Sequence, residues 1–464
     1  MIKARSPRTT LATIFATCVL SLNLPAQARD EGALPNLVLI IADDLGYGDL
    51  GCYGGKIPTP HLDRMANEGL RLTDFHSNGS VCSPSRAALI SGKYQQRTGV
   101  DGVVTADPEN AAYRFGLDPE KQTTLPKAMS QAGYKTALFG KWHLGYLDKF
   151  HPMNYGFDRF VGFVSGNIDY HSHLDRMNTF DWWHNRELTK ETGYSTHLIT
   201  RHAVDYIEKH KDEPFFVYVA HEAVHSPIQG PTDAIQRGPD KVKGERRPSK
   251  EVYRDMLTEL DKGVGEILKA LQDNGLAEKT LVVFSSDNGP MKLASPGPLK
   301  GRKGSIYEGG HRVPGVFWWP GTIEPGTESK QTAAQFDLFP TIVDLAGIKG
   351  DFDFDGVSIK SLWNGEKLAN RKLFWRPGGL SPYEPKLENG KDVRKAIRDG
   401  KWKLVAQPGY EKVELFDLES DLAEKHDLAS KHPERVERMK QELHAWEQEM
   451  LTLLPYQTKP SKKK

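Results

Sequence analysis

Four apolar runs, spread over much of the chain, each end in a group of polar residues. They cover residues 35–49, 134–145, 213–225 and 279–290. An apolar run without alternating polar residues is typical of a strand buried on both faces, as in a parallel sheet covered by helices. Ligands of open α/β sheets bind beyond the carboxyl ends of the strands. We therefore expect the four runs to bring Asp, Asn, His and Lys side chains to one place.

The segments around these runs have helical spacing. Apolar residues recur at helical intervals from Tyr253 to Leu271, and residues 335–348 have a helical pattern with a proline near the start. Strands that alternate with helices predict an α/β fold with a large, mostly parallel sheet between layers of helices. After residue 371, short alternating runs around Asp399-Gly400 and a charged amphipathic segment predict a smaller domain with an antiparallel sheet and a helix.

The length of 464 residues favours two domains, since single cores rarely grow beyond about 250–300 residues. We expect a signal peptide over residues 1–28, a large domain over 29–370, a small C-terminal α+β domain over 371–456 and a disordered basic tail over 457–464. The formal net charge is only +1, so charge gives no reason to expect a nucleic-acid partner.

The first 28 residues have the pattern of a secretory signal peptide. Three basic residues precede an apolar run over 11–24, and Ala26-Gln27-Ala28 forms an A-x-A cleavage site. A retained membrane anchor is the alternative, but the run is short for a bilayer. A lipoprotein is disfavoured because Cys18 lies within the run. We expect cleavage after residue 28 and a periplasmic or secreted protein without a membrane attachment, with the bacterial periplasm favoured over a eukaryotic secretory route.

Two pairs of oxygen-bearing side chains follow predicted buried strands. They are Asp43-Asp44 and Asp287-Asn288. Hard cations such as Ca²⁺ and Mg²⁺ prefer these ligands, and the lack of histidine or thiolate in the pairs disfavours zinc. A helix cap or a turn would be the commoner role for either pair alone.

Cys82 and Cys52 are the cysteines that remain after signal removal. One disulfide is the simplest expectation for an exported protein. Cys82, however, lies at the apparent start of a helix, with Arg86 about one turn later. This position also suits a cysteine nucleophile, and Cys52 is then expected to be a small buried apolar side chain.

Residues 82–92, CSPSRAALISG, resemble the signature of the type I, formylglycine-dependent sulfatases of the alkaline phosphatase superfamily. The family motif is C-x-P-S-R followed by a short helix and Ser or Thr before Gly. GKWHLG at 140–145 is similar to the second family signature. DDLGYGDLGCYG, DNGP and GRKGSIYEGGHRVP are similar to other blocks, in family order. The resemblance runs from about Asn36 to about Leu418 and implies an alkaline phosphatase-like fold with a catalytic sulfatase domain over residues 29–370.

The resemblance implies that a formylglycine-generating maturation enzyme oxidises Cys82 to an aldehyde, whose hydrate attacks sulfur. The second hydroxyl of the hydrate then loses its proton, sulfate leaves and the aldehyde returns. The metal would be one Ca²⁺ per chain that also contacts the hydrate. Its implied ligands are Asp43, Asp44, Cys82, Asp287 and Asn288.

The same resemblance implies roles for six further residues. Arg86 would neutralise the hydrate, and His143 would be the base for sulfate elimination. Lys141 and Lys303 would contact sulfate oxygens. His225 would be the general acid, shared with Lys303. The implied substrate-binding residues are Lys141, Ser165, His225 and Lys303.

For several other residues the sequence leaves two roles open. Trp182 and Trp183 in the aromatic segment 167–185 would stack on sugars or pack their loop. The basic segment 236–250 would attract a polyanionic glycan or be merely solvated. His221 would contact ligand or pack. Lys300 and Arg302 are expected to be solvated or at the substrate rim.

The sequence therefore predicts an exported, calcium-dependent sulfuric ester hydrolase that acts on a sulfated carbohydrate or an aryl sulfate. One alternative is a phosphonate monoester hydrolase or phosphodiesterase of the same superfamily. Another is a catalytically silent glycan-binding protein in which Cys82 stays unmodified. The oligomeric state is not predicted.

Overall fold

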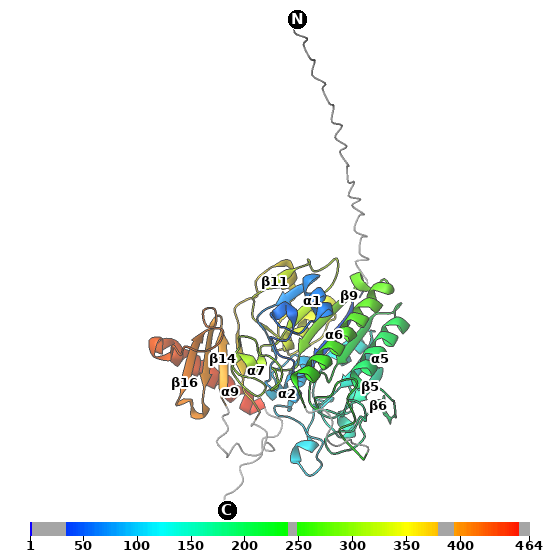
Figure 1. Ribbon diagram of the computed structural model, residues 1–464. Helices are drawn as coiled ribbons and strands as arrows, with labels where there is room; N and C mark the ends of the chain where they lie inside the picture. The colour runs from blue at the N-terminus through cyan, green and yellow to red at the C-terminus, as the bar shows by residue number, and fades with distance from the viewer. Residues whose placement is uncertain (2–33, 240–247, 379–393, 454–464) are drawn as a thin grey trace, which may run out of the picture. The chain divides into compact units, whose positions relative to one another are not determined.

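The computed structural model describes Met1 and residues 34–239, 248–378 and 394–453, and Pro35–Lys464 forms one compact unit. A ten-stranded sheet runs through this unit in the order β11-β2-β10-β9-β1-β8-β4-β5-β6-β7 (Figure 1). The strands are β1 (Asn36–Ala42), β2 (Leu70–Leu72), β4 (Lys135–Lys141), β5 (Arg159–Phe163), β6 (Trp183–His184), β7 (Glu187–Leu188), β8 (Phe215–Ala220), β9 (Thr280–Ser286), β10 (Gly315–Trp318) and β11 (Thr327–Ser329).

The four apolar runs of the sequence form the neighbouring strands β9, β1, β8 and β4, which are all parallel. The register aligns their carboxyl ends, because Ala42 pairs with Ser286 and Ala220 pairs with Gly140. Polar residues that follow these strands therefore emerge at one edge of the sheet, as the pattern predicts.

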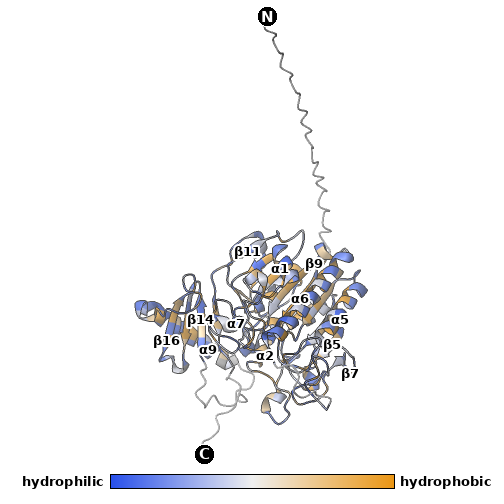
Figure 2. Cartoon of the chain, viewed as in Figure 1, coloured by the Kyte–Doolittle hydropathy of each residue, from blue (hydrophilic) through white to orange (hydrophobic). Residues whose placement is uncertain are grey.

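Helices cover both faces of the large sheet. Alternate residues of β1 point to opposite faces: Val38 and Ile40 pack in the core with α1, α5 and α6, whereas Leu39 and Ile41 pack in the core with α2, α4 and α8. The helix bounds are α1 (Pro60–Asn67), α2 (Cys82–Ser91), α3 (Gln95–Thr98), α4 (Leu125–Gln131), α5 (Ser195–Lys209), α6 (Lys250–Asp273), α7 (Glu308–His311) and α8 (Leu338–Leu345). Figure 2 shows hydrophobic residues along the strands and hydrophilic residues on parts of α5 and α6.

The predicted helices lie where their apolar spacing places them. The stripe from Tyr253 to Leu271 is the buried face of α6, and the Ser249 hydroxyl caps this helix by accepting from the Val252 amide at 3.3 Å. The segment 335–348 contains a 3₁₀ turn and then α8.

A second, four-stranded sheet follows in the chain. It is antiparallel, in the order β13 (Lys372–Trp375), β14 (Lys395–Asp399), β15 (Trp402–Ala406) and β16 (Val413–Asp417), and α9 (Pro433–Leu453) packs on it. The predicted turn joins β14 to β15, where Gly400 has a φ of 58°. A short parallel pair, β3 (Phe75–His76) with β12 (Ala333–Ala334), completes the sheets. The predicted fold class is confirmed.

The predicted domain boundary at residue 370 stays a prediction. The expected signal peptide, apart from Met1, and the basic tail over 457–464 lie outside the described residues, as does part of the segment 236–250. Within the described ranges, no helix combines the length and the apolar character that crossing a bilayer requires.

Candidate active site

The expected metal ligands lie together beyond the carboxyl ends of β1 and β9. The Asp44 amide donates to Oδ1 of Asp287 at 3.2 Å, and Nδ2 of Asn288 donates to Oδ1 of Asp44 at 2.7 Å. Asp43, Asp44, Asp287 and Asn288 are each at most 1% exposed. Residues 243 and 244 positions apart in the chain thus form one buried cluster.

Three cations offset the charge of the three carboxylates. Nζ of Lys141 lies 2.5 Å from Oδ2 of Asp43, Nη2 of Arg86 lies 2.9 Å from Oδ2 of Asp287, and Nζ of Lys303 lies 2.7 Å from Oδ1 of Asp44. Burial without such partners would cost several kcal/mol for each ion. Burial raises the pKa of Asp44, but the interactions with His225, Lys303 and Asn288 outweigh it and the pKa falls to about 2.

Two oxygen atoms of this cluster have no hydrogen-bond donor among the described residues. They are Oδ1 of Asp43 and Oδ1 of Asn288, and both are buried. Buried polar atoms nearly always have a partner, and an all-oxygen set of carboxylates and an amide suits Ca²⁺ or Mg²⁺. Ligand atoms of Asp43, Asp44, Cys82 and His225 also lie within 4.8 Å of one another. The residues therefore fit a hard divalent cation.

Cys82 begins α2 and is buried beside this cluster. Its Sγ lies 3.4 Å from Nζ of Lys303. Both Cys82 and Cys52 are free, so the disulfide that the position of Cys82 argued against is not formed. Burial raises the pKa of the Cys82 thiol even though Lys141 and Lys303 oppose the shift. Cys52 is only partly buried and packs against the core, close to the predicted apolar role.

The two histidines present different nitrogen atoms. Nε2 of His143 lies 3.1 Å from the Val104 carbonyl, and Nδ1 of His225 lies 2.7 Å from the Ser226 carbonyl. A carbonyl only accepts, so these nitrogens carry the protons, which leaves Nδ1 of His143 and Nε2 of His225 as basic atoms. Nε2 of His225 lies 3.5 Å from Oδ2 of Asp44. Burial lowers the pKa of His225 to about 3 and that of His143 well below its usual value.

A cavity of about 320 Å³ opens above the cluster. Five of the predicted residues line it: Cys82, His143, Ser165, His225 and Lys303. Lys141 is fully buried and pairs with Asp43, and Arg86 pairs with Asp287 and donates to the Lys141 carbonyl at 3.3 Å. These two cations therefore support the floor of the site, and the predicted contact of Lys141 with sulfate stays a prediction.

The other lining residues were not named individually as site residues: Val103, Val104, Thr105, Ala106, Asp107, Tyr146, Gly166, Asn167, Arg176 and Met177. They come from three loops. The hydroxyl of Tyr146 accepts from the Gly166 amide at 3.0 Å and so joins two of these loops. Only the fold shows that these segments meet, although the aromatic segment 167–185 pointed to part of this wall.

The residues with two interpretations mainly have structural roles. Nε1 of Trp182 donates to Glu191 at 2.8 Å, Nε1 of Trp183 donates to Asp181 at 2.7 Å, and neither ring lines the cavity. His221 is buried away from the cavity lining.

Lys300 and Arg302 also lie off the cavity. Nζ of Lys300 donates to the Glu424 carbonyl at 3.1 Å. Arg302 donates to the Met291 and Ala294 carbonyls at 2.9 and 2.6 Å. Arg302 is exposed and Lys300 is partly exposed, in line with the expectation of solvated side chains, and both cations also bind carbonyls of neighbouring segments.

A buried cluster of carboxylates that fits a hard cation lies at the carboxyl edge of a mostly parallel sheet, beside a cysteine that begins a helix, and this arrangement suits a hydrolase. Residues 35–348 match the family model described as Sulfatase, and residues 302–449 match the model for the C-terminal part of N-sulphoglucosamine sulphohydrolase. The chain belongs to the sulfatase family and is a sulfuric ester hydrolase.

Similar proteins cover most of the chain. N-acetylgalactosamine-6-sulfatase of Canis lupus familiaris is 35% identical over 373 residues, which span 74% of this chain and 69% of the relative. Arylsulfatase A of Homo sapiens is 33% identical over 469 residues, with 88% and 86% coverage. The crystal structure of Ps i-CgsB in complex with k-i-k-neocarrahexaose is similar with a TM-score of 0.77 and 31% identity, and covers 89% of this chain and 93% of that chain.

Proposed function

We propose that this sulfatase is exported, binds Ca²⁺ and hydrolyses sulfate esters of carbohydrates through a formylglycine hydrate derived from Cys82. One observation carries the proposal: Cys82 lies within 4.8 Å of the ligand atoms of Asp43, Asp44 and His225, at the wall of the cavity. Export rests on the pattern of residues 1–28, and the sulfated carbohydrate rests on the names of the similar proteins.

The metal ligands and Lys303 have different roles in this proposal. Ca²⁺, held by Asp43, Asp44, Asp287 and Asn288, would supply Lewis-acid and template chemistry. Lys303 holds a positive charge between Cys82 and Asp44, where negative charge gathers as the ester reacts.

Proton transfer is assigned to the two histidines. Nε2 of His225, once protonated, donates to the leaving alcohol oxygen as the sulfur–oxygen bond breaks, and Lys303 lies near enough to share this task. His143 keeps its Nε2 proton on the Val104 carbonyl and offers Nδ1 as the base that removes the hydroxyl proton before sulfate leaves. The lowered pKa of His143 suits a base that starts neutral, whereas His225, with a pKa of about 3, has to take up a proton before it can act as the acid.

Mass spectrometry of the peptide that contains Cys82 tests the modification, since the aldehyde and the thiol differ in mass and in hydrazide reactivity. Desulfation of defined sulfated sugars tests the substrate class, and turnover of small aryl sulfates alone would count against a carbohydrate. Cys82→Ala is expected to abolish both activities, whereas Cys52→Ala is the matched control and is expected to keep them. Full activity of Cys82→Ala would overturn the mechanism.

A further inference from the structure

Arg176 lies at the tip of a tightly held turn in the wall of the active-site cavity. The Asp175 carboxylate accepts the amides of Met177 and Thr179, both at 2.8 Å, and the Asn178 amide donates to the Asp175 carbonyl at 3.1 Å. The turn therefore fixes the backbone around Arg176, and the carboxylate of the preceding residue, Asp175, accepts from backbone amides. The Arg176 side chain is exposed, and within the described ranges it makes no hydrogen bond or ion pair.

A second guanidinium holds the base of this loop. Arg237 donates from Nη1 to the Asn167 and Leu174 carbonyls at 3.2 and 3.0 Å, and from Nη2 to Oδ1 of Asn167 at 2.5 Å. These acceptors are neutral, and no ion pair involves Arg237 in the part of the chain that the structure describes. Burial lowers the pKa of Arg237, and the charge of Arg176 adds to this shift. This wall thus carries two guanidinium groups without an ion-pair partner among the described residues, although the charges of Glu222, Asp169 and Asp175 offset part of the charge of Arg237.

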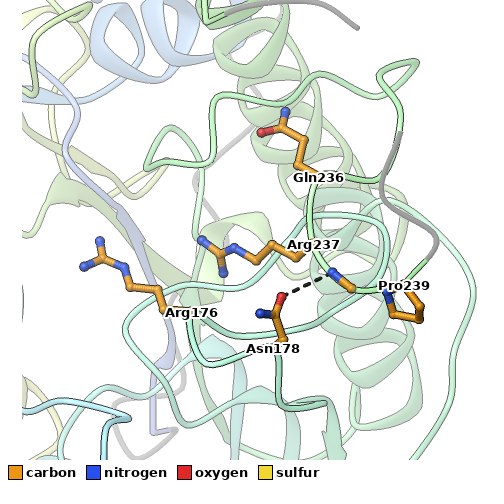
Figure 3. Close-up of a pocket in the computed structure, with 6 residues that line it drawn as sticks. Arg176, Asn178, Gln236, Arg237 and Pro239 are labelled. Carbon is orange, nitrogen blue, oxygen red and sulfur yellow. Dashed lines mark hydrogen bonds between the residues drawn. The ribbon is translucent and has the colours of Figure 1, made fainter. Parts of the chain in front are cut away.

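Arg176 joins two cavities. It lines the active-site cavity with Cys82 and Lys303, and it lines a neighbouring cavity of about 440 Å³. The other lining residues of the second cavity are Asn178, Gln236, Arg237, Gly238 and Pro239 (Figure 3). Figure 3 shows Arg237 reaching toward the loop of Arg176, and Asn178 accepting from the Gly238 amide at 3.2 Å. The second cavity is therefore built by two loops tied to each other.

We propose that Arg176 determines specificity by binding a second anionic group of the substrate, on the sugar joined to the one that carries the scissile sulfate. This inference rests on the proposed function. The planar guanidinium matches a carboxylate or a sulfate with two parallel hydrogen bonds, which an ammonium does not provide. Arg237 is a positioning residue that holds the loop and adds positive potential.

The test compares two disaccharides: one with a single sulfate, and the same disaccharide with a further anion on the neighbouring sugar. One arm uses a carboxylate as this anion and the other a second sulfate. The wild-type kcat/KM is expected to be higher for the doubly anionic compound in at least one arm. Arg176→Ala is expected to lower the ratio of the two kcat/KM values about tenfold, and Arg176→Lys to lower it less. Arg254→Ala, at an exposed position on α6 outside both cavities, is the matched control and should leave the ratio unchanged.

Failure of this inference is distinguishable from failure of the proposed function. Turnover by the wild type with a ratio that Arg176→Ala changes less than twofold in both arms would overturn the role of Arg176 alone. Calorimetric binding of the same disaccharides to the Cys82→Ala protein gives the comparison without turnover. Tighter binding of the doubly anionic compound that Arg176→Ala abolishes supports the inference even where no sulfate ester is hydrolysed, and equal binding overturns it.

Discussion

Replacing Lys403 with methionine should weaken the attachment of the small sheet to the rest of the protein. Lys403 lies on β15 and is fully buried, with Nζ 2.9 Å from Glu308, 3.0 Å from Glu424 and 3.2 Å from Nε2 of His311. Glu308 belongs to α7, so the ammonium joins the small sheet to the segment beside the active site. Methionine keeps the length of the side chain but removes the cation that Glu424 pairs with, whereas Glu308 keeps its ion pair with Arg312 at 3.1 Å. Breaking a buried pair in this way costs about 3–5 kcal/mol.

The cost should depend on pH in a defined direction. Burial raises the pKa of Glu424 to about 7, although Lys403 opposes the shift. Loss of Lys403 raises this pKa further, so the folded variant binds a proton more tightly than the unfolded chain does. A raised folded pKa gives stability that is present at low pH and is lost as the pH rises through that pKa. The penalty of Lys403→Met should therefore be larger at pH 8 than at pH 5.5.

Urea unfolding followed by tryptophan fluorescence measures this penalty, since Trp375 stacks on His311 with ring centroids 4.2 Å apart. Lys401→Met is the matched control, because Lys401 is half-exposed two residues away and its ion pair with Asp417 is solvated. Lys403→Met should unfold at a clearly lower urea concentration than Lys401→Met. Equal midpoints for the two variants, or a penalty that does not change with pH, would refute the reasoning.

Three further outcomes are expected. Lys303→Met should lower kcat by about 10²–10³-fold, as loss of one preorganised donor does, and an unchanged kcat would contradict its placement beside Cys82. Ca²⁺ added at 100 times its dissociation constant should stabilise the protein, first freed of metal with a chelator, by about 2.7 kcal/mol in thermal unfolding. Asp287→Ala should remove this stabilisation, and a variant that keeps it would exclude Asp287 as a ligand. Trp182→Ala should cost about 3–5 kcal/mol of stability because the ring is fully buried, and selective loss of glycan affinity in a stable variant would argue for stacking instead.

The centre of the fold and the floor of the site follow from local patterns. Asp43 and Asp287 each come directly after a predicted buried strand, and the parallel register of β1 with β9 brings the ends of those strands together. This requires only that buried strands pair side by side, so the sequence is sufficient to predict it. Cys82 and Arg86 share one helical turn, which is likewise a local relation.

The cavity wall depends on contacts that no local pattern encodes. Asn167 reaches the cavity because Arg237, 70 residues later, binds its carbonyl and its side chain. Lys403 belongs to a strand in which polar and apolar residues alternate, and this pattern predicts a solvent-exposed lysine. The side chain is instead fully buried, because Glu308 and Glu424 from other segments pair with its ammonium group. Trp182 and Trp183 likewise make contacts that their sequence pattern does not encode, since their indole nitrogens donate to Glu191 and Asp181, as the loop-packing interpretation expects.

The charges of the inner cluster explain why this cluster by itself would attract an ester anion only after a metal binds. The carboxylates of Asp43, Asp44 and Asp287 are matched by the cations of Arg86, Lys141 and Lys303, so their formal charges cancel. A divalent cation added to this balanced set leaves an excess of two positive charges in a low-dielectric cavity, where a sulfate ester would be strongly attracted. Arg176 and Arg237 then extend the positive potential along one wall, toward the second cavity. A glycan with several anionic groups would therefore be guided by the outer charges and held for reaction by the inner ones, and increasing salt should weaken the outer effect first because exposed charges are screened more than buried ones.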